Sequence, residues 1–125
     1  MNVRYFYRDI LCITDNEIAE QLEASTRVLK INRGELLIRQ GERQEDFSFL
    51  VSGIFRGFYF DALGRDTTDC FGFKKGTPCM SIAINNGISP INIEAVTPCE
   101  FIQIPGSQLI PLIERNPTLL RIYNN

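Results

Sequence analysis

Residues 39–60 read RQGERQEDFSFLVSGIFRGFYF, and this stretch decides the fold. Its first part, from Gly41 to Asp46, is polar and typical of a loop. Residues 47–60 are rich in aromatic and aliphatic side chains that favour β-strands. Gly53 interrupts this run, and a glycine inside a strand marks a bend or a bulge. The stretch therefore predicts a polar loop followed by an aromatic strand that bends at Gly53.

Side chains along a strand point alternately to its two faces. In the aromatic strand, Arg56 would therefore share one face with Phe58 and Phe60. Phe55 and Tyr59 would point to the opposite face. The sequence thus predicts a sheet that carries aromatic side chains on both faces, with one arginine among them.

Further short strands are predicted on both sides of this stretch. The apolar or alternating runs are residues 28–31, 36–38, 66–73, 91–96 and 99–104, and a hairpin loop of about four residues at 61–64 precedes the run at 66–73. Many short strands separated by glycine-containing turns are typical of a β-sandwich or a jelly roll.

Helices are predicted near both ends of the chain. Thr14 and Glu17 have the spacing of a capping box, which predicts a short amphipathic helix over 15–24. Asn116 followed by Pro117 is typical of a second helix start, because proline is favoured at the first helical position. The sequence ends about two turns into that helix, so we expect the chain to continue in a longer parent protein.

Composition excludes several classes of protein. The chain has 125 residues, enough for one domain, with 44% apolar and 22% charged residues. It has no histidine, which removes Ser-His-Asp and Cys-His nucleophiles and most metal-enzyme sites. The formal net charge is −2, which argues against DNA binding by this chain itself. No apolar run could span a bilayer and no signal peptide is recognisable, so we expect a cytoplasmic protein.

The four cysteines do not form a recognisable metal or dithiol motif. They are Cys12, Cys70, Cys79 and Cys99, and no pair has CxxC spacing. We expect free thiols that behave as small apolar side chains. A single redox-sensing or liganding thiol stays open as the alternative.

The order of the glycines and their neighbours resembles the effector-sensing N-terminal domain of the Crp/Fnr family of bacterial transcription regulators. The resemblance covers roughly residues 14–123 and implies a mainly β fold with flanking helices, namely a cyclic nucleotide-binding-like double-stranded β-helix, or jelly roll. The pieces that carry it are Gly34-Glu35, Gln40-Gly41-Glu42, Phe49-Leu50-Val51-Ser52-Gly53, Asp61 with Gly64, Gly76, Glu94-Ala95-Val96-Thr97-Pro98-Cys99-Glu100-Phe101 and Asn116-Pro117.

The resemblance also implies how the parent protein is organised. Residues 1–125 would form a single sensor domain, with the jelly roll at about 26–105 and the start of a dimerisation helix at about 117–125. In the family a helix-turn-helix domain follows that helix and enters the major groove of DNA. This chain lacks the DNA-binding domain, and we expect a homodimer in the longer parent. The candidate dimerisation residues are Leu119, Leu120, Ile122 and Tyr123.

The family's nucleotide binders hold the ribose with a Glu and the phosphate with an Arg that precedes a Ser or Thr, because a buried phosphate needs a strong fork-shaped donor. The matching segment here is residues 76–90. The resemblance places Ser81 at the Glu position, Ser89 at the Arg position and Pro90 at the hydroxyl position. Residues 80–89 carry no charge. Losing one partner of a buried charge pair costs about 2–5 kcal/mol, so we do not expect tight binding of cyclic nucleotides.

An uncharged segment at that place suggests an apolar or aromatic effector. Ser81 and Ser89 would be its polar anchors. Alternatively, the same side chains simply fill the core of the jelly roll and no effector binds. The candidate pocket consists of Phe71, Cys79, Met80, Ser81, Ile82, Ser89 and Pro90.

Two other functions stay open from the sequence. The chain could be a stand-alone binding module, or one fused to a kinase or transporter, including a residual cyclic-nucleotide binder. A cupin-type enzyme shares the jelly-roll outline, but cupin metal sites depend on histidine, so we do not expect an enzyme. Iron–sulfur or haem sensing would need a cysteine cluster or suitable axial ligands. We therefore expect no cofactor, and the partners are an unidentified small-molecule effector, or none, and no membrane.

Overall fold

The computed structural model describes residues 2–79 and 87–115. Within these residues, no helix has the length and apolar content needed to cross a bilayer. In chain order the elements are α1 (Val3–Tyr5), the π-helix η1 (Phe6–Ile10), α2 (Asn16–Ser25), β1 (Arg27–Ile31), β2 (Leu36–Ile38), β3 (Asp46–Ser52), β4 (Phe55–Phe60), β5 (Asp66–Gly72), β6 (Asn92–Ala95), β7 (Cys99–Pro105) and α3 (Gly106–Arg115).

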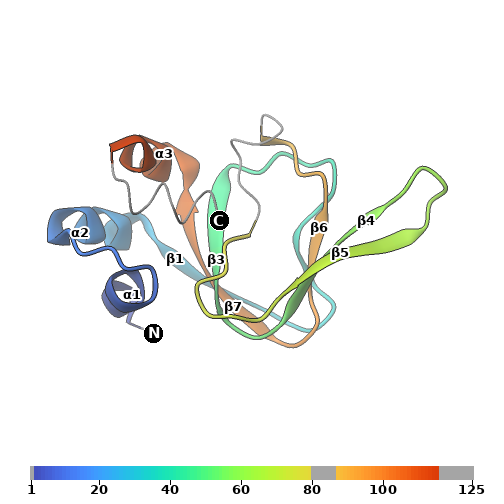
Figure 1. Cartoon of the computed structure of the whole chain (residues 1–125), viewed down its shortest axis with the longest axis horizontal. Helices are drawn as coiled ribbons and strands as arrows, with labels where there is room; N and C mark the ends of the chain where they lie inside the picture. The colour runs from blue at the N-terminus through green and yellow to red at the C-terminus, as the bar shows by residue number, and fades with distance from the viewer. Residues whose placement is uncertain (1, 80–86, 116–125) are drawn as a thin grey trace.

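The strands form two antiparallel sheets, one with the order β1-β7-β3 and the other with the order β2-β6-β4-β5. The helices gather on one side of the three-stranded sheet, while the β4–β5 hairpin extends away on the opposite side of the molecule (Figure 1). A mainly β architecture with flanking helices was predicted, and it is confirmed. Because sequence neighbours such as β2 and β3 lie in different sheets, most of the packing joins distant parts of the chain.

Alternate side chains along β3 and β7 point to opposite faces of the sheet and pack into two separate hydrophobic cores. Phe49 and Ile102 point to the helices, where they pack with apolar side chains of α2 and α3. Leu50 and Phe101 point between the two sheets, and Phe101 lies 6.0 Å from the ring of Phe55 on β4. β3 and β7 are therefore buried on both faces, which explains their largely apolar sequences, whereas β1 at the edge of the sheet is mostly exposed.

The N-terminal segment belongs to the helical core, which the sequence analysis did not predict. Phe6 and Tyr7 are 1% and 0% exposed. The Tyr7 hydroxyl shares a hydrogen bond with the hydroxyl of Thr26, and burial raises the pKa of this phenol. The segment closes the apolar surface formed by α2, α3 and β7.

The first long helix starts one residue later than its predicted cap. Asp15 Oδ1 accepts hydrogen bonds from the backbone N–H of Glu17 at 2.9 Å and of Ile18 at 3.2 Å. The prediction that Thr14 caps this helix is therefore wrong. An Asp at this position satisfies two orphan amides and places negative charge at the positive end of the helix.

Gly53 marks the turn between β3 and β4, as predicted. Its φ angle is +98°, a backbone conformation that residues other than glycine adopt only with strain. A Cβ atom at this position would lie 2.4 Å from the carbonyl oxygen of Pro98. The close approach lets the chain leave the three-stranded sheet and enter the four-stranded one.

Candidate functional site

The segment that resembles the family's ligand-binding cassette is described at its two flanks, 76–79 and 87–90. The first flank runs along β3. Gly76 N donates to Leu50 O at 2.7 Å, and Cys79 N donates to Ser48 O at 2.8 Å. This flank is therefore held to the three-stranded sheet by backbone hydrogen bonds.

The second flank is held by the polar loop that follows β2 and begins at Gly41. Gly41 N donates to Ser89 O at 2.8 Å, and Ser89 N donates to Glu42 O at 3.0 Å. The Ser89 side chain is 3% exposed, and its hydroxyl donates to Ile91 O at 2.6 Å. The hydroxyl of Ser89 thus stabilises its own turn, and the turn glycine Gly41 ties the segment to the loop.

The predicted pocket residues do not all face the same space. Cys79 is buried between the sheets, where burial raises the pKa of its thiol, so it stays protonated and apolar. Phe71 is 59% exposed and lies on the outer face of the four-stranded sheet, and Pro90 is also exposed. Phe71 therefore lies on the outer surface, and the structure does not place it beside Cys79. Met80, Ser81 and Ile82 lie outside the described residues.

Gly72 explains why Phe71 points outward. Gly72 is the inward-facing residue of β5, because the ring of Phe55 lies directly over it. A Cβ atom at Gly72 would be 2.2 Å from two carbon atoms of that ring. Since alternate residues face opposite ways, the neighbouring Phe71 is placed outside.

The candidate dimerisation residues also lie outside the described part of the chain. They are Leu119, Leu120, Ile122 and Tyr123.

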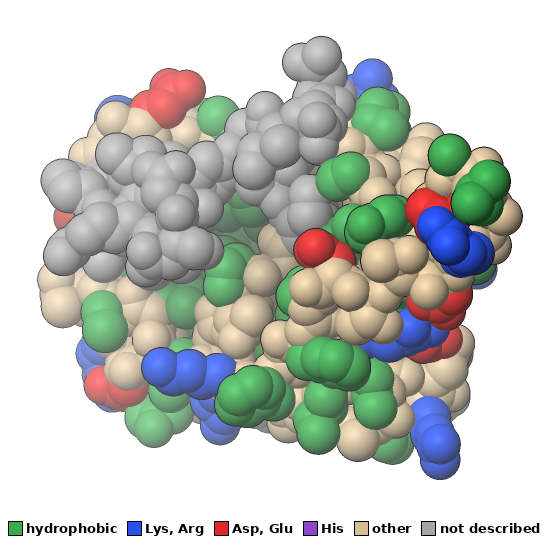
Figure 2. Space-filling model, turned by 45° about the vertical axis from the view of Figure 1, so that its right-hand side comes forward, with side chains coloured by type: hydrophobic (Ala, Val, Ile, Leu, Met, Phe, Trp, Pro, Cys, Tyr) green, Lys and Arg blue, Asp and Glu red, His purple; other side chains and the backbone are tan. Residues whose placement is uncertain are grey.

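Arg56 is the centre of an ion-pair network on the outer face of the four-stranded sheet. Its Nε lies 2.8 Å from Glu94 Oε1, and its Nη2 lies 2.9 Å from Asp66 Oδ2. Its guanidinium also stacks on the ring of Phe58 at 3.9 Å. Hydrogen bonds to Asp66, and to a smaller extent to Glu94, raise the pKa of Arg56. Figure 2 brings the right-hand side of Figure 1 forward, and on this face hydrophobic side chains lie among acidic and basic ones.

This network decides whether a strand or loop arginine could replace the missing phosphate ligand. Arg56 faces away from the space between the sheets, and two carboxylates already neutralise it. Arg65 in the hairpin loop is exposed and pairs with Asp61 at 2.8 Å. Neither guanidinium is placed to meet an anion between the sheets.

Sequence reasoning missed a row of polar side chains that crosses the three-stranded sheet. Arg27, Gln103 and Ser48 lie opposite one another on β1, β7 and β3. Arg27 Nε donates to Gln103 Oε1 at 2.9 Å, and Gln103 Nε2 donates to Ser48 Oγ at 3.1 Å. The row borders a hollow of about 500 Å³ that is lined by Arg27, Leu29, Leu36, Leu37, Arg43, Gln44, Glu45, Asp46 and Gln103.

A signal for this row was present in the sequence. Ser48 and Gln103 are polar residues inside strands whose other members are largely apolar, and both are at least 93% buried. A buried polar side chain requires a hydrogen-bond partner. Their pairing could not be deduced, because it depends on the register between β3 and β7.

Comparisons with known proteins find the same fold. The model of the cyclic nucleotide-binding domain matches residues 28–116. No curated protein matches the chain. A candidate cyclic nucleotide-binding protein from Ruegeria pomeroyi DSS-3 has a similar structure, with a TM-score of 0.77 and 23% identity; the match covers 96% of this chain and 56% of that one. This chain therefore spans little more than half the length of that protein.

Two further structures have the same fold. The sensor domain of the transcriptional regulator DNR from Pseudomonas aeruginosa has a TM-score of 0.80 at 14% identity, and the match covers 97% of this chain and 86% of that one. The regulatory domain of Toxoplasma gondii PKA, solved with cAMP, has a TM-score of 0.81 at 17% identity, with 98% and 47% covered. These likenesses confirm the predicted jelly roll. Because the domain model matches most of its length, the chain belongs to the cyclic nucleotide-binding domain family.

Proposed function

We propose that the chain is the effector-sensing domain of a Crp/Fnr-like transcription regulator and that it does not respond to cyclic nucleotides. One observation carries the second part of this proposal. At Ser89, the position that the resemblance assigns to the phosphate-binding arginine, a short hydroxyl is engaged with Ile91 O. Arg56 on β4 and Arg65 in the hairpin loop are paired with carboxylates on the outside.

The energetic consequence is large enough to measure. The phosphate of a cyclic nucleotide is an anion, and burying it without a charged partner costs about 2–5 kcal/mol. At about 1.4 kcal/mol for each factor of ten, affinity falls by roughly 30-fold to several thousand-fold. Serine at position 81 would also lack the carboxylate that holds the ribose in the family.

Calorimetric titration of the purified chain with cyclic AMP and cyclic GMP tests the exclusion. We expect no binding tighter than millimolar for the natural chain. The matched variant carries Ser81→Glu and Ser89→Arg, which restores the two side chains that the family uses. Micromolar binding by the natural chain contradicts the proposal, whatever the variant does.

The regulatory role is supported by the DNR sensor domain, which has the same fold and is 14% identical. In this proposal the parent protein is a cytoplasmic homodimer, dimerised through Leu119, Leu120, Ile122 and Tyr123. DNA is bound by a domain that this chain does not contain, and the chain itself is a regulatory domain without catalytic residues. Sequencing the parent gene beyond the codon for Asn125 tests this role, because a helix-turn-helix is expected there.

A second candidate is a regulatory module attached to a different effector. The likeness to the regulatory domain of Toxoplasma gondii PKA favours it, with a TM-score of 0.81. The same gene sequence separates the two functions, because a downstream domain other than a helix-turn-helix would support the second. A stop codon after Asn125 would support a stand-alone module.

A further inference from the structure

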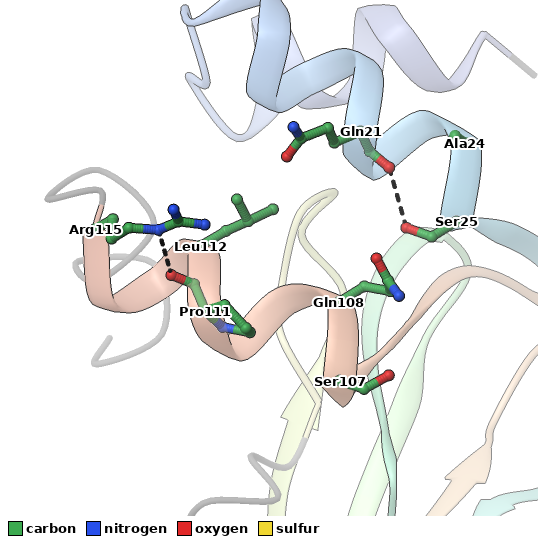
Figure 3. A pocket seen from close by; sticks show the side chains of 8 residues that line it. All are labelled: Gln21, Ala24, Ser25, Ser107, Gln108, Pro111, Leu112 and Arg115. Atoms are coloured by element: carbon green, nitrogen blue, oxygen red, sulfur yellow. Dashed lines mark hydrogen bonds between the residues drawn. The ribbon is translucent and has the colours of Figure 1, made fainter.

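A hollow of about 510 Å³ lies between α2 and α3, outside the two sheets (Figure 3). Small-molecule sites commonly have volumes of about 300–1,000 Å³, so the hollow has a suitable size. All its lining residues come from these two helices, and they are Gln21, Ala24, Ser25, Ser107, Gln108, Pro111, Leu112 and Arg115.

Two side-chain amides, one on each helix, line this space. Gln108 reaches from α3 towards α2, whereas the side chain of Gln21 runs sideways from α2, so that its amide lies above Leu112 in this view (Figure 3). Within the described part of the chain, neither amide makes a hydrogen bond. Each offers two N–H donors and one carbonyl acceptor. A ligand that lies between the helices could therefore satisfy donors and acceptors on both walls.

The charge of the hollow is one-sided. Among the described residues, Arg115 is the only charged one that lines the hollow, and none of the lining residues is a carboxylate. Its Nε donates to Pro111 O at 3.2 Å, which holds the guanidinium beside Leu112 at one end of the hollow (Figure 3). Among the described residues no carboxylate pairs with Arg115, so its terminal nitrogens can bind an anion. A guanidinium prefers a planar carboxylate, which it can contact with two parallel hydrogen bonds.

The remaining lining is partly apolar. Ala24, Pro111 and Leu112 contribute hydrocarbon surface, and Leu112 is only 7% exposed. An inorganic anion would leave this surface and the two amides uncontacted. An organic acid with an apolar body and an amide-like polar group would contact all three kinds of lining.

We propose that the hollow binds a small organic carboxylate whose acid group pairs with Arg115, whose apolar part covers Leu112, and whose amide or hydroxyl groups meet Gln21 and Gln108. This inference does not depend on the proposed function, because none of the described cassette residues, 76–79 and 87–90, lines the hollow. Such a ligand would contact α2 and α3 at once and hold the two helices together.

Nuclear magnetic resonance titration of the full chain with N-acetyl-L-leucine tests this proposal, since that probe carries a carboxylate, an amide and an apolar side chain. We expect saturable shifts of the side-chain amide signals of Gln21 and Gln108 and of the Nε–H signal of Arg115, at low millimolar concentration. N-acetyl-L-leucinamide, which is nearly identical but neutral, should bind about tenfold more weakly or worse.

Variants separate the hollow from other surfaces. Arg115→Gln should weaken binding about tenfold, whereas Arg33→Gln, an exposed arginine in the turn between β1 and β2, should leave it unchanged. Ala24→Phe should fill the hollow and abolish binding while the spectrum of the sheets is preserved. The proposal is overturned if the probe shifts none of these three signals, if the neutral amide binds equally well, or if Arg115→Gln binds like the natural chain.

Discussion

Replacing Gly72 by alanine should lower the free energy of unfolding, because the Phe55 ring occupies the place of the new methyl group. The added Cβ would lie 2.2 Å from two ring carbons and 2.8 Å from a third. Phe55 is 3% exposed and cannot swing into solvent without losing its place in the core. Overpacking of this kind costs about 1–3 kcal/mol, and the gain from restricting the unfolded chain is about 0.4–1 kcal/mol.

The net loss expected for Gly72→Ala is therefore at most about 2.5 kcal/mol, with a central value of about 1 kcal/mol. Urea unfolding followed by far-ultraviolet circular dichroism measures it, and the midpoint should fall by roughly 1 M. Phe55→Leu should destabilise the protein alone, yet in the double variant it should make room for the methyl group. We expect a favourable coupling of about 1 kcal/mol between the two substitutions.

Phe71→Ser is the matched control for the orientation of β5. Phe71 is 59% exposed, so this substitution should change the free energy of unfolding by about 0.5 kcal/mol or less. The reasoning is refuted if Gly72→Ala is neutral and Phe71→Ser costs more than about 2 kcal/mol. That pattern would mean that Phe71 faces the interior and Gly72 does not.

Three further predictions follow from the described contacts. Arg56→Gln should lower the free energy of unfolding by about 1–2 kcal/mol, between the values for exposed and buried ion pairs, and the loss should shrink in Asp66→Asn protein. Gly53→Ala should cost about 2–4 kcal/mol, because its positive φ adds strain to a backbone clash; a loss below about 1 kcal/mol would contradict this. Burial raises the pKa of Tyr7, so stability should fall as pH rises above about 10, where the unfolded phenol ionises. Urea midpoints for Tyr7→Phe should lose part of this alkaline dependence.

Local sequence patterns were sufficient to predict most strands. The run over 47–60 became β3 and β4 because its aromatic and aliphatic residues suit a pleated, buried surface. Gly53 was found at the bend because only glycine combines a positive φ with such a close backbone contact. These features depend on residues within a few positions of each other, so the sequence carries them directly.

Burial that depends on distant partners was not predictable in the same way. Phe6 and Tyr7 are buried by α2, α3 and β7, which lie from ten to about a hundred positions further along the chain. The face of Phe71 depends on the pairing of β5 with β4, which includes a register shift between Gly57 and Phe58. The alternation of side chains along β5 defines two faces. Only the packing of the Phe55 ring over Gly72 decides which face points inside.

By itself, the sequence determined that this protein is a small jelly roll without histidine chemistry, and that its cassette lacks charge over 80–89. Tertiary structure alone decided that Arg56 is neutralised on the outer face and that Ser89 supports its own turn. It also created the hollow between α2 and α3, whose walls are about eighty positions apart in the chain. The physical reason is that strand composition acts locally, whereas charge pairing and cavities arise where elements distant in the sequence pack together.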